Sequence, residues 1–219
     1  MSLSAPLGPG GRMFKTALSE GAELRPLTPD LAEEFAAHID RGREFIGRHV
    51  ALADVVSDAD AAGRFLEAYA EKAATDTGRI WGIWLDGTHG NASGGTHGNA
   101  SGGTHGNASG GTLVGGVLFR AMDFRMETAE AGCWLEPAAV GKGLVTRAVT
   151  VIIDWAIEVR GIHRVDWWAS TRNTPSIAVA ERLGMTKEGV AREAYLHRGE
   201  RHDMEIWSVL APEWRAGRK

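Results

Sequence analysis

Cysteine, long apolar runs and an excess of positive charge are all scarce or missing in this chain of 219 residues. The only cysteine is Cys133, so a disulfide within the chain and a zinc site made of several cysteines are both excluded. No apolar run approaches the roughly 20 residues needed for a membrane-spanning helix. The 24 basic and 28 acidic residues give a net charge of −4, which argues against a nucleic-acid-binding surface. We therefore expect neither a membrane nor a nucleic acid as a partner.

Apolar residues make up 43% of the chain, which is enough to build one packed core. Residues 1–12 lack the apolar stretch of a signal peptide and are predicted to form a flexible leader. These features predict a soluble, cytoplasmic protein with a single domain over residues 13–219.

Residues 87–110 are three identical copies of the octapeptide GTHGNASG. The block has no apolar residue larger than alanine, so it cannot bury enough surface to offset the entropy lost on ordering, and a loop is predicted. Its histidines could bind a metal, its Asn-Ala-Ser triplets match the glycosylation pattern, and it could bind a partner. The interpretation we favour is an insertion without chemistry of its own, and no metal site is predicted.

The segments that flank the repeat, residues 79–85 and 113–119, are both rich in strand-forming residues. Removing the three copies joins Asp86 to Gly111, which is typical of a tight turn between two strands. A long insertion costs little in such a turn, because loop-closure entropy grows by only about 0.6 kcal/mol for each doubling of length. Residues 87–110 are therefore predicted to be a loop inserted in a β-hairpin of the domain.

The rest of the chain alternates between strand and helix patterns. Strands are expected over residues 23–27, 129–135, 164–169, 190–196 and 204–210. Helices are expected after Thr28 as a cap, from Ser57 to about Ala74, over residues 143–160, and over residues 174–183. This order predicts an α/β fold with one central, mixed sheet.

The segment Val140-Gly-Lys-Gly-Leu-Val-Thr146 lies between a predicted strand and a long amphipathic helix. Glycines let the backbone approach a ligand, and the free N–H groups at a helix start attract phosphate. A P-loop would need Gly and Ser or Thr where Glu136 and Gly143 stand, and the dinucleotide fingerprint would need a third glycine at Thr146. A nucleoside triphosphatase is excluded on this segment, and an NAD-type oxidoreductase is disfavoured.

Three segments in this order, residues 133–137 (CWLEP), 140–146 (VGKGLVT) and 173–184 (NTPSIAVAERLG), resemble the GNAT superfamily of acyl-CoA-dependent N-acetyltransferases. The resemblance is closest to the RimJ/RimL branch, which modifies protein N-termini, including those of ribosomal proteins. It extends over most of the chain, from residues 24–27 to residues 201–207, although Ala138 and Val140 depart from the usual pattern. It implies a single domain with a mixed, mostly antiparallel sheet flanked by helices, and acetyl-CoA as cosubstrate.

The resemblance also implies a layout for the acetyl-CoA site. The strand that ends at Trp134 and Leu135 would pair with the pantetheine arm, and Asn173 would bind the end of that arm. Ser176 would lie near the cofactor sulfur. Backbone amides of the loop would hold the pyrophosphate, and the Lys142 side chain would add positive charge. The loop residues are Val140, Gly141, Lys142, Gly143, Leu144, Val145 and Thr146.

Direct attack of a neutral amine on the thioester needs no covalent nucleophile, so Cys133 is expected to be a buried strand residue rather than an acyl carrier. Ser176 could protonate or solvate the departing thiolate, or it could be an ordinary hydroxyl in the first turn of its helix. Tyr195 and Glu193 are the other candidate proton-handling residues. His197 and His202 could also assist near neutral pH, but their place at a predicted turn favours exposure to solvent.

The leading hypothesis is an N-acetyltransferase that acts on a protein N-terminus, such as that of a ribosomal protein, or on a small amine. A homodimer is a further expectation. The alternative is a non-catalytic module of the same fold that responds to acyl-CoA or binds a partner. Such a module would bind acetyl-CoA without turnover on any amine.

Overall fold

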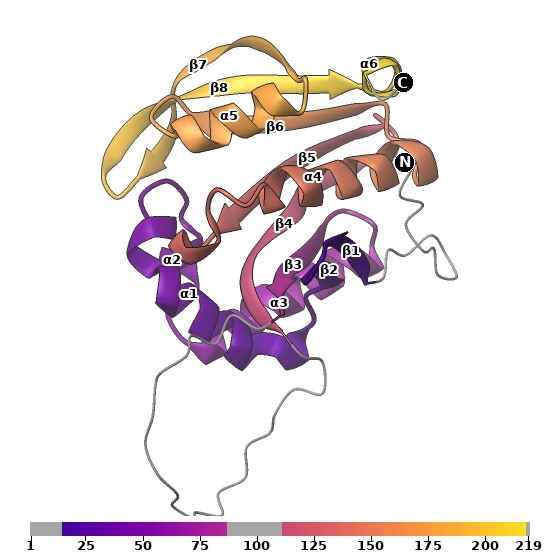
Figure 1. Cartoon of the computed structure of the whole chain (residues 1–219). Coiled ribbons are helices and arrows are strands. Elements are labelled where there is room, and N and C mark those ends of the chain that lie inside the picture. The colour runs from indigo at the N-terminus through magenta and orange to yellow at the C-terminus, as the bar shows by residue number, and fades with distance from the viewer. Residues whose placement is uncertain (1–14, 87–110, 218–219) are drawn as a thin grey trace, which may run out of the picture.

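The computed structural model describes residues 15–86 and 111–217, so the predicted leader and the predicted repeat loop lie outside the described residues. Within the described part of the chain, eight strands form one sheet in the order β1-β2-β3-β4-β5-β6-β8-β7 (Figure 1). Neighbouring strands are antiparallel except β5 and β6, which are parallel. The predicted α/β class with a mixed, mostly antiparallel sheet is therefore confirmed.

The strands are β1 (Thr16–Ser19), β2 (Ala22–Pro26), β3 (Arg79–Leu85), β4 (Thr112–Asp123), β5 (Thr128–Leu135), β6 (Arg164–Ser170), β7 (Thr186–His197) and β8 (Glu200–Leu210). The α-helices are α1 (Ala32–Ile46), α2 (Leu52–Val55), α3 (Ala59–Ala74), α4 (Leu144–Asp154), α5 (Thr174–Arg182) and α6 (Ala211–Ala216). Two 3₁₀ turns, η1 (Pro29–Leu31) and η2 (Pro137–Ala139), and one π-helical turn, η3 (Trp155–Val159), complete the elements.

Several element boundaries differ from the sequence predictions. Helix α3 begins at Ala59, two residues after the predicted start at Ser57, and its cap is Asp58, whose carboxylate accepts the Ala61 N–H at 2.8 Å. The predicted helix over residues 143–160 is α-helical only as far as Asp154 and then widens into η3. Strand β7 begins at Thr186, before the predicted start at residue 190. The prediction missed this part because most of the edge strand is exposed and lacks alternating apolar residues.

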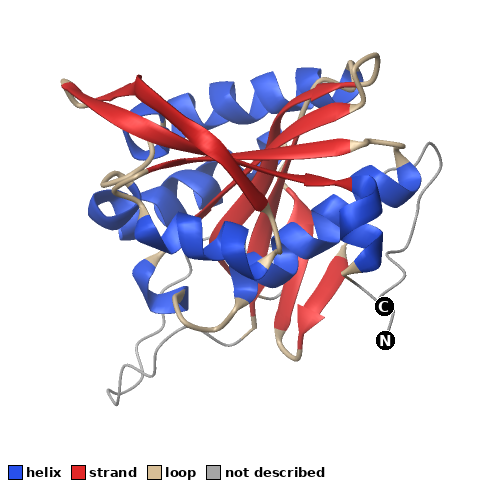
Figure 2. Cartoon of the chain, turned by 90° about the horizontal axis from the view of Figure 1, so that it is seen from above, coloured by secondary structure: helices blue, strands red, loops and turns tan. Residues whose placement is uncertain are grey.

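Helices cover both faces of the sheet (Figure 2). On one face α1 and α3 contribute Phe35, Ile39 and Leu66 to an apolar core against β3, β4 and β5. On the other face α4 and η3 contribute Ile152 and Trp155 to a second apolar core. The sheet is thus fixed between two helical layers. No helix of residues 15–86 and 111–217 is long and apolar enough to cross a membrane.

The pairing of β3 with β4 brings the flanks of the repeat together, with Leu85 opposite Thr112. The more important pairing for function is the parallel one between β5 and β6. It runs only from Thr128 opposite Arg164 to Ala131 opposite Trp167. Beyond this point the two strands diverge, and within residues 15–86 and 111–217 the end of β5 pairs with a strand only on its β4 side.

Candidate active site

A deep cleft of about 1220 Å³ lies where β5 and β6 diverge. Its walls come from β5, the loop before α4, β6 and the start of α5. At its other end, the segment between α1 and α2 faces β7 and β8. In Figure 1 the β7–β8 hairpin curves toward α2, which closes that end of the molecule. The predicted acetyl-CoA segments, the α1–α2 segment and β7 therefore line one and the same cleft.

The loop before α4 contains two glycines in the left-handed region, Gly141 with φ of +82° and Gly143 with φ of +68°. Both line the cleft, and a Cβ at Gly141 would find no atom within 4 Å. Residues with a side chain pay a conformational penalty at such φ values, so glycine is the residue that allows this loop shape. The loop backbone is therefore open toward the cleft.

Helix α4 starts directly after this loop, and its first intrahelical bond joins the Arg147 N–H to the Gly143 carbonyl. The earlier N–H groups of the first turn thus have no intrahelical acceptor, which is the arrangement that binds anions. Among the predicted loop residues, the cleft wall includes Val140, Gly141, Gly143, Leu144, Val145 and Thr146. Lys142 is exposed and does not contribute to the wall.

The end of β5 places Trp134 and Leu135, which the resemblance assigns to the pantetheine arm, on the cleft wall. Two glycines of β4 make room for them, since Gly116 pairs with Trp134 and Gly115 pairs with Leu135. A Cβ on Gly116 would lie 2.2 Å from the Trp134 ring, so only glycine fits there. The opposite edge of β5 carries backbone N–H and C=O groups that β6 does not pair beyond Ala131.

The start of α5 brings Asn173 and Ser176 to the same cleft. The Asn173 carboxamide oxygen accepts the Ser176 N–H at 3.2 Å and caps the helix. The Trp167 indole N–H donates to Ser176 Oγ at 3.0 Å. Because the indole can only donate, the hydroxyl proton of Ser176 is directed to another acceptor, and the donated bond makes it a better donor.

Tyr195 also lines the cleft, at the end formed by the α1–α2 segment. Its hydroxyl accepts the Ala51 N–H at 3.1 Å and lies 3.4 Å from His197 Nδ1. His197 Nε2 lies 2.9 Å from the Gly47 carbonyl oxygen, so this nitrogen is the donor. Arg198 binds Asp54 through two hydrogen bonds of 2.8 and 3.2 Å. The hairpin is thus attached to the α1–α2 segment at three points.

Unlike Tyr195, the candidate residues Glu193 and His197 do not line the cleft. Glu193 is exposed and outside the cleft wall, because a bulge between Ala191 and Tyr195 gives it a φ of +52°. Its backbone N–H donates to Asp203 Oδ1 at 2.8 Å. The expectation of solvated histidines is wrong for His197, which is 6% exposed because it packs beneath the α1–α2 segment.

Sequence reasoning missed His49, which lines the cleft between α1 and α2 without any motif around it. Burial, and then the charge of Arg48 and the nearby histidines, lower the pKa of His49, so its imidazole is neutral at pH 7.

Cys133 also lines the cleft, and burial raises the pKa of its thiol to about 12. Such a thiol stays protonated and is a poor nucleophile. In the described ranges no group of His, Cys, Asp or Glu residues is arranged to hold a metal ion.

The fold and the cleft define a class of acyltransferase in which an open strand edge and a glycine loop face one cavity. Residues 22–186 match the family described as "Acetyltransferase (GNAT) domain". The chain belongs to the GNAT acetyltransferase family, and the resemblance drawn from the sequence is confirmed. Like its relatives, it is an N-acetyltransferase.

Similar proteins include "Putative ribosomal N-acetyltransferase YdaF" of Bacillus subtilis (strain 168), which is 29% identical over 203 residues, 92% of this chain and 98% of that protein. The "[Ribosomal protein uS5]-alanine N-acetyltransferase" of Escherichia coli (strain K12) is 33% identical over 78 residues, 36% of this chain and 40% of that protein. A crystal structure described as "Probable acetyltransferase" has a TM-score of 0.76 at 27% identity, over 92% of this chain and 99% of that chain.

Proposed function

We propose that this acetyltransferase uses acetyl-CoA to acetylate the α-amino group of a protein N-terminus. The observation that carries the proposal is the single cleft that joins the glycine loop, the open edge of β5 and Ser176 to the space beside Tyr195. Relatives named for ribosomal proteins support a protein acceptor. Ribosomal acceptors would set the reaction in the cytoplasm.

The residues of the cleft fit a CoA thioester. Gly141 and Gly143 leave the loop backbone open, and the unpaired N–H groups at the start of α4 can bind a pyrophosphate. The open edge of β5 at Trp134 and Leu135 can pair with an extended amide-containing arm. Asn173 uses its oxygen to cap α5, which leaves its side-chain NH₂ free to donate to that arm.

Acetyl-CoA supplies the acetyl thioester that a neutral amine attacks directly. Ser176 would donate its hydroxyl proton toward the departing sulfur, since its oxygen is already held by the Trp167 indole. His49 is neutral at pH 7 and lines the same cleft, so it is the candidate acceptor for the proton lost by the amine. Tyr195 would orient the acceptor, because its ring lines the cleft and its hydroxyl is fixed by Ala51.

The test is acetyl transfer from radiolabelled acetyl-CoA to three acceptor sets. The first set is peptides with the N-terminal sequences of ribosomal proteins, the second is the same peptides with blocked N-termini, and the third is a panel of small amines. We expect label on the free N-terminal peptides and none on the blocked ones. Turnover on small amines alone would refute the protein acceptor. Acetyl-CoA binding without turnover on any acceptor would instead favour a non-catalytic module.

A further inference from the structure

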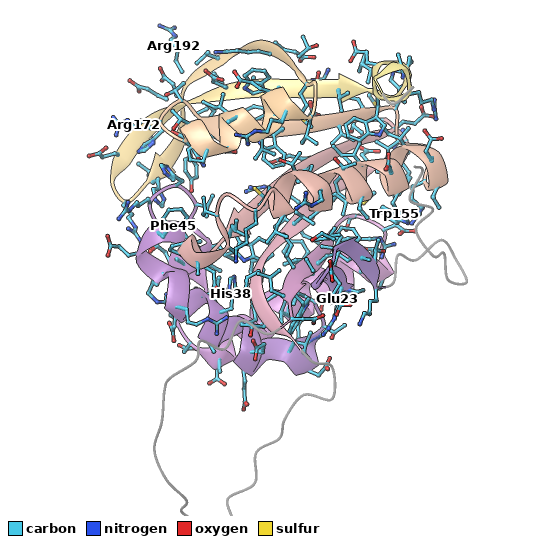
Figure 3. All side chains as sticks on the ribbon, viewed as in Figure 1. Glu23, His38, Phe45, Trp155, Arg172 and Arg192 are labelled. Atoms are coloured by element: carbon cyan, nitrogen blue, oxygen red, sulfur yellow. The ribbon has the colours of Figure 1, made fainter. Side chains whose placement is uncertain are left out.

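A polar cluster is buried behind the acetyl-CoA strand, on the side of β5 that faces α1. His38 of α1 is completely buried, and Glu136, the residue after β5, is 7% exposed (Figure 3 labels His38). The Trp134 indole N–H donates to His38 Nε2 at 3.0 Å, and His38 Nδ1 lies 3.3 Å from Glu136 Oε2. Arg41 donates to the same carboxylate oxygen at 3.3 Å and to the Leu113 carbonyl at 2.6 Å.

These contacts fix the protonation state of His38. An indole nitrogen can only donate, so His38 Nε2 is the acceptor and carries no proton. The single proton of the neutral ring is therefore on Nδ1, where it is donated to the Glu136 carboxylate. Burial lowers the pKa of His38 and keeps the ring neutral. Burial would raise the pKa of Glu136, but the hydrogen bonds from His38 and Arg41 and the charge of Arg41 outweigh it, and that pKa is lowered.

The cluster contacts the end of β5 that does not pair with β6. Trp134 lies beyond the last pair with β6, so this end of β5 is held by β4 and by the side chain of Trp134. The indole ring lies between Gly116 and His38. Glu136 stands where the chain leaves β5 and turns into η2 and the glycine loop. One imidazole therefore connects α1 both to the open strand edge and to the start of the loop.

Stability alone does not explain a buried carboxylate such as that of Glu136. Burial removes the water that hydrates the charge, and replacing a buried ion pair by apolar residues often leaves the fold equally stable. The free-energy cost of desolvation can be offset by a gain in fixed geometry, since a hydrogen-bonded polar network allows fewer side-chain arrangements than an apolar contact. Resting on the proposed function, we propose that His38 is a positioning residue for the acetyl-CoA site. It acts through Trp134 and Glu136, and it sets the open edge of β5 and the glycine loop relative to α1.

The test compares Trp134→Phe and His38→Leu with a matched control elsewhere. Trp134→Phe keeps an aromatic side chain, but it removes the indole N–H from which His38 accepts a hydrogen bond and the ring that carries this N–H. The control is Trp214→Phe, because the Trp214 indole likewise donates a hydrogen bond to a side chain, Asp154 Oδ1 at 2.8 Å. This bond joins α6 to α4 and lies outside the cleft. All three variants are expected to lower the urea unfolding midpoint. Only His38→Leu and Trp134→Phe are expected to raise the KM for acetyl-CoA, by about tenfold, with kcat within threefold of wild type.

A conservative variant separates geometry from loss of packing. The amide of His38→Gln can accept from Trp134 and donate to Glu136, so it is expected to keep the KM for acetyl-CoA within threefold of wild type. A second readout needs no turnover: the NMR signal of the Trp134 indole N–H, assigned by its loss in Trp134→Phe. This proton is expected to exchange slowly with water in wild type and in His38→Gln, and rapidly in His38→Leu.

These measurements distinguish failure of the positioning role of His38 from failure of the proposed function. Normal acetyl-CoA kinetics in His38→Leu and Trp134→Phe, with stability losses like that of Trp214→Phe, would overturn the positioning role while leaving the proposed function intact. A Trp134 indole proton that exchanges as fast in wild type as in His38→Leu would overturn it independently of activity. Wild-type protein that binds no acetyl-CoA would instead refute the proposed function, and the positioning role with it.

Discussion

Replacing Gly141 by alanine tests the glycine loop directly, because a matched control exists in the same chain. Gly141 and Gly161 both have left-handed φ values, +82° and +71°, and a Cβ at either position would meet no atom within 4 Å. Alanine at each site should therefore cost the fold no more than the conformational penalty, roughly 1 kcal/mol. The two sites differ in place, since Gly141 lines the cleft and Gly161 does not.

The effect on acetyl-CoA affinity follows from what the loop must do on binding. If alanine at position 141 relaxes to a negative φ in the free protein, restoring the binding shape costs about 1 kcal/mol, which raises Kd about fivefold. If one amide–phosphate hydrogen bond is also lost, at about 2 kcal/mol, the combined increase is about a hundredfold. Gly161→Ala lacks both effects, so its Kd should equal that of wild type.

Calorimetric titration with acetyl-CoA measures the two affinities, and urea unfolding checks that neither stability loss exceeds about 1 kcal/mol. We expect Gly141→Ala to weaken binding between about fivefold and about a hundredfold, and Gly161→Ala to leave it unchanged. Equal affinities in the two variants and wild type would show that this loop does not bind the pyrophosphate, and the assignment of the acetyl-CoA site would fail.

Three further changes probe the chemistry and the electrostatics. Ser176→Ala should lower kcat by about a hundredfold with little change in acetyl-CoA affinity, because it removes the proton donor, and steady-state kinetics near wild-type values would contradict that role. Cys133→Ala should retain activity, and the thiol, whose pKa is raised to about 12, should react slowly with iodoacetamide at pH 8. Detection of an acetylated Cys133 by mass spectrometry during turnover would oppose direct transfer. The hydrogen bond from Arg164 lowers the pKa of Glu188 from its usual 4.5 to about 2. Its stabilising contribution is therefore complete above about pH 5 and is lost as pH falls toward 2. The free energy of unfolding of Glu188→Gln should differ from that of wild type at pH 7, and the difference should shrink as pH falls from about 5 toward 2, whereas a difference independent of pH would contradict the assignment.

Predictions from the sequence were best where one segment carries its own signal. The strand over residues 129–135 and the glycine loop that follows were predicted with nearly correct bounds. The apolar face of residues 145–156 predicted α4, although not the change to a π-helical turn at Trp155. Strand β7 was predicted too short, because an exposed edge strand carries little alternation.

The candidate site shows the same division. Gly141, Gly143 and Ser176 were predicted by their resemblance to a family pattern, and they line one cleft. Glu193 was a candidate as an ionisable residue on the last predicted hairpin, but a bulge in β7 leaves it outside the cleft wall. His49 was missed because it lies in a connecting segment without a motif.

The sequence by itself determined the order of strands and helices, the glycine loop before α4 and the membership in the GNAT family, since periodicity, turn residues and motifs are local properties of the chain. Only the tertiary structure decided which distant residues meet. His38 contacts Trp134 and Glu136, and His197 contacts Gly47, across many intervening residues. Such contacts depend on how helices pack on the sheet and where β5 separates from β6, and no local pattern in the chain encodes either geometry.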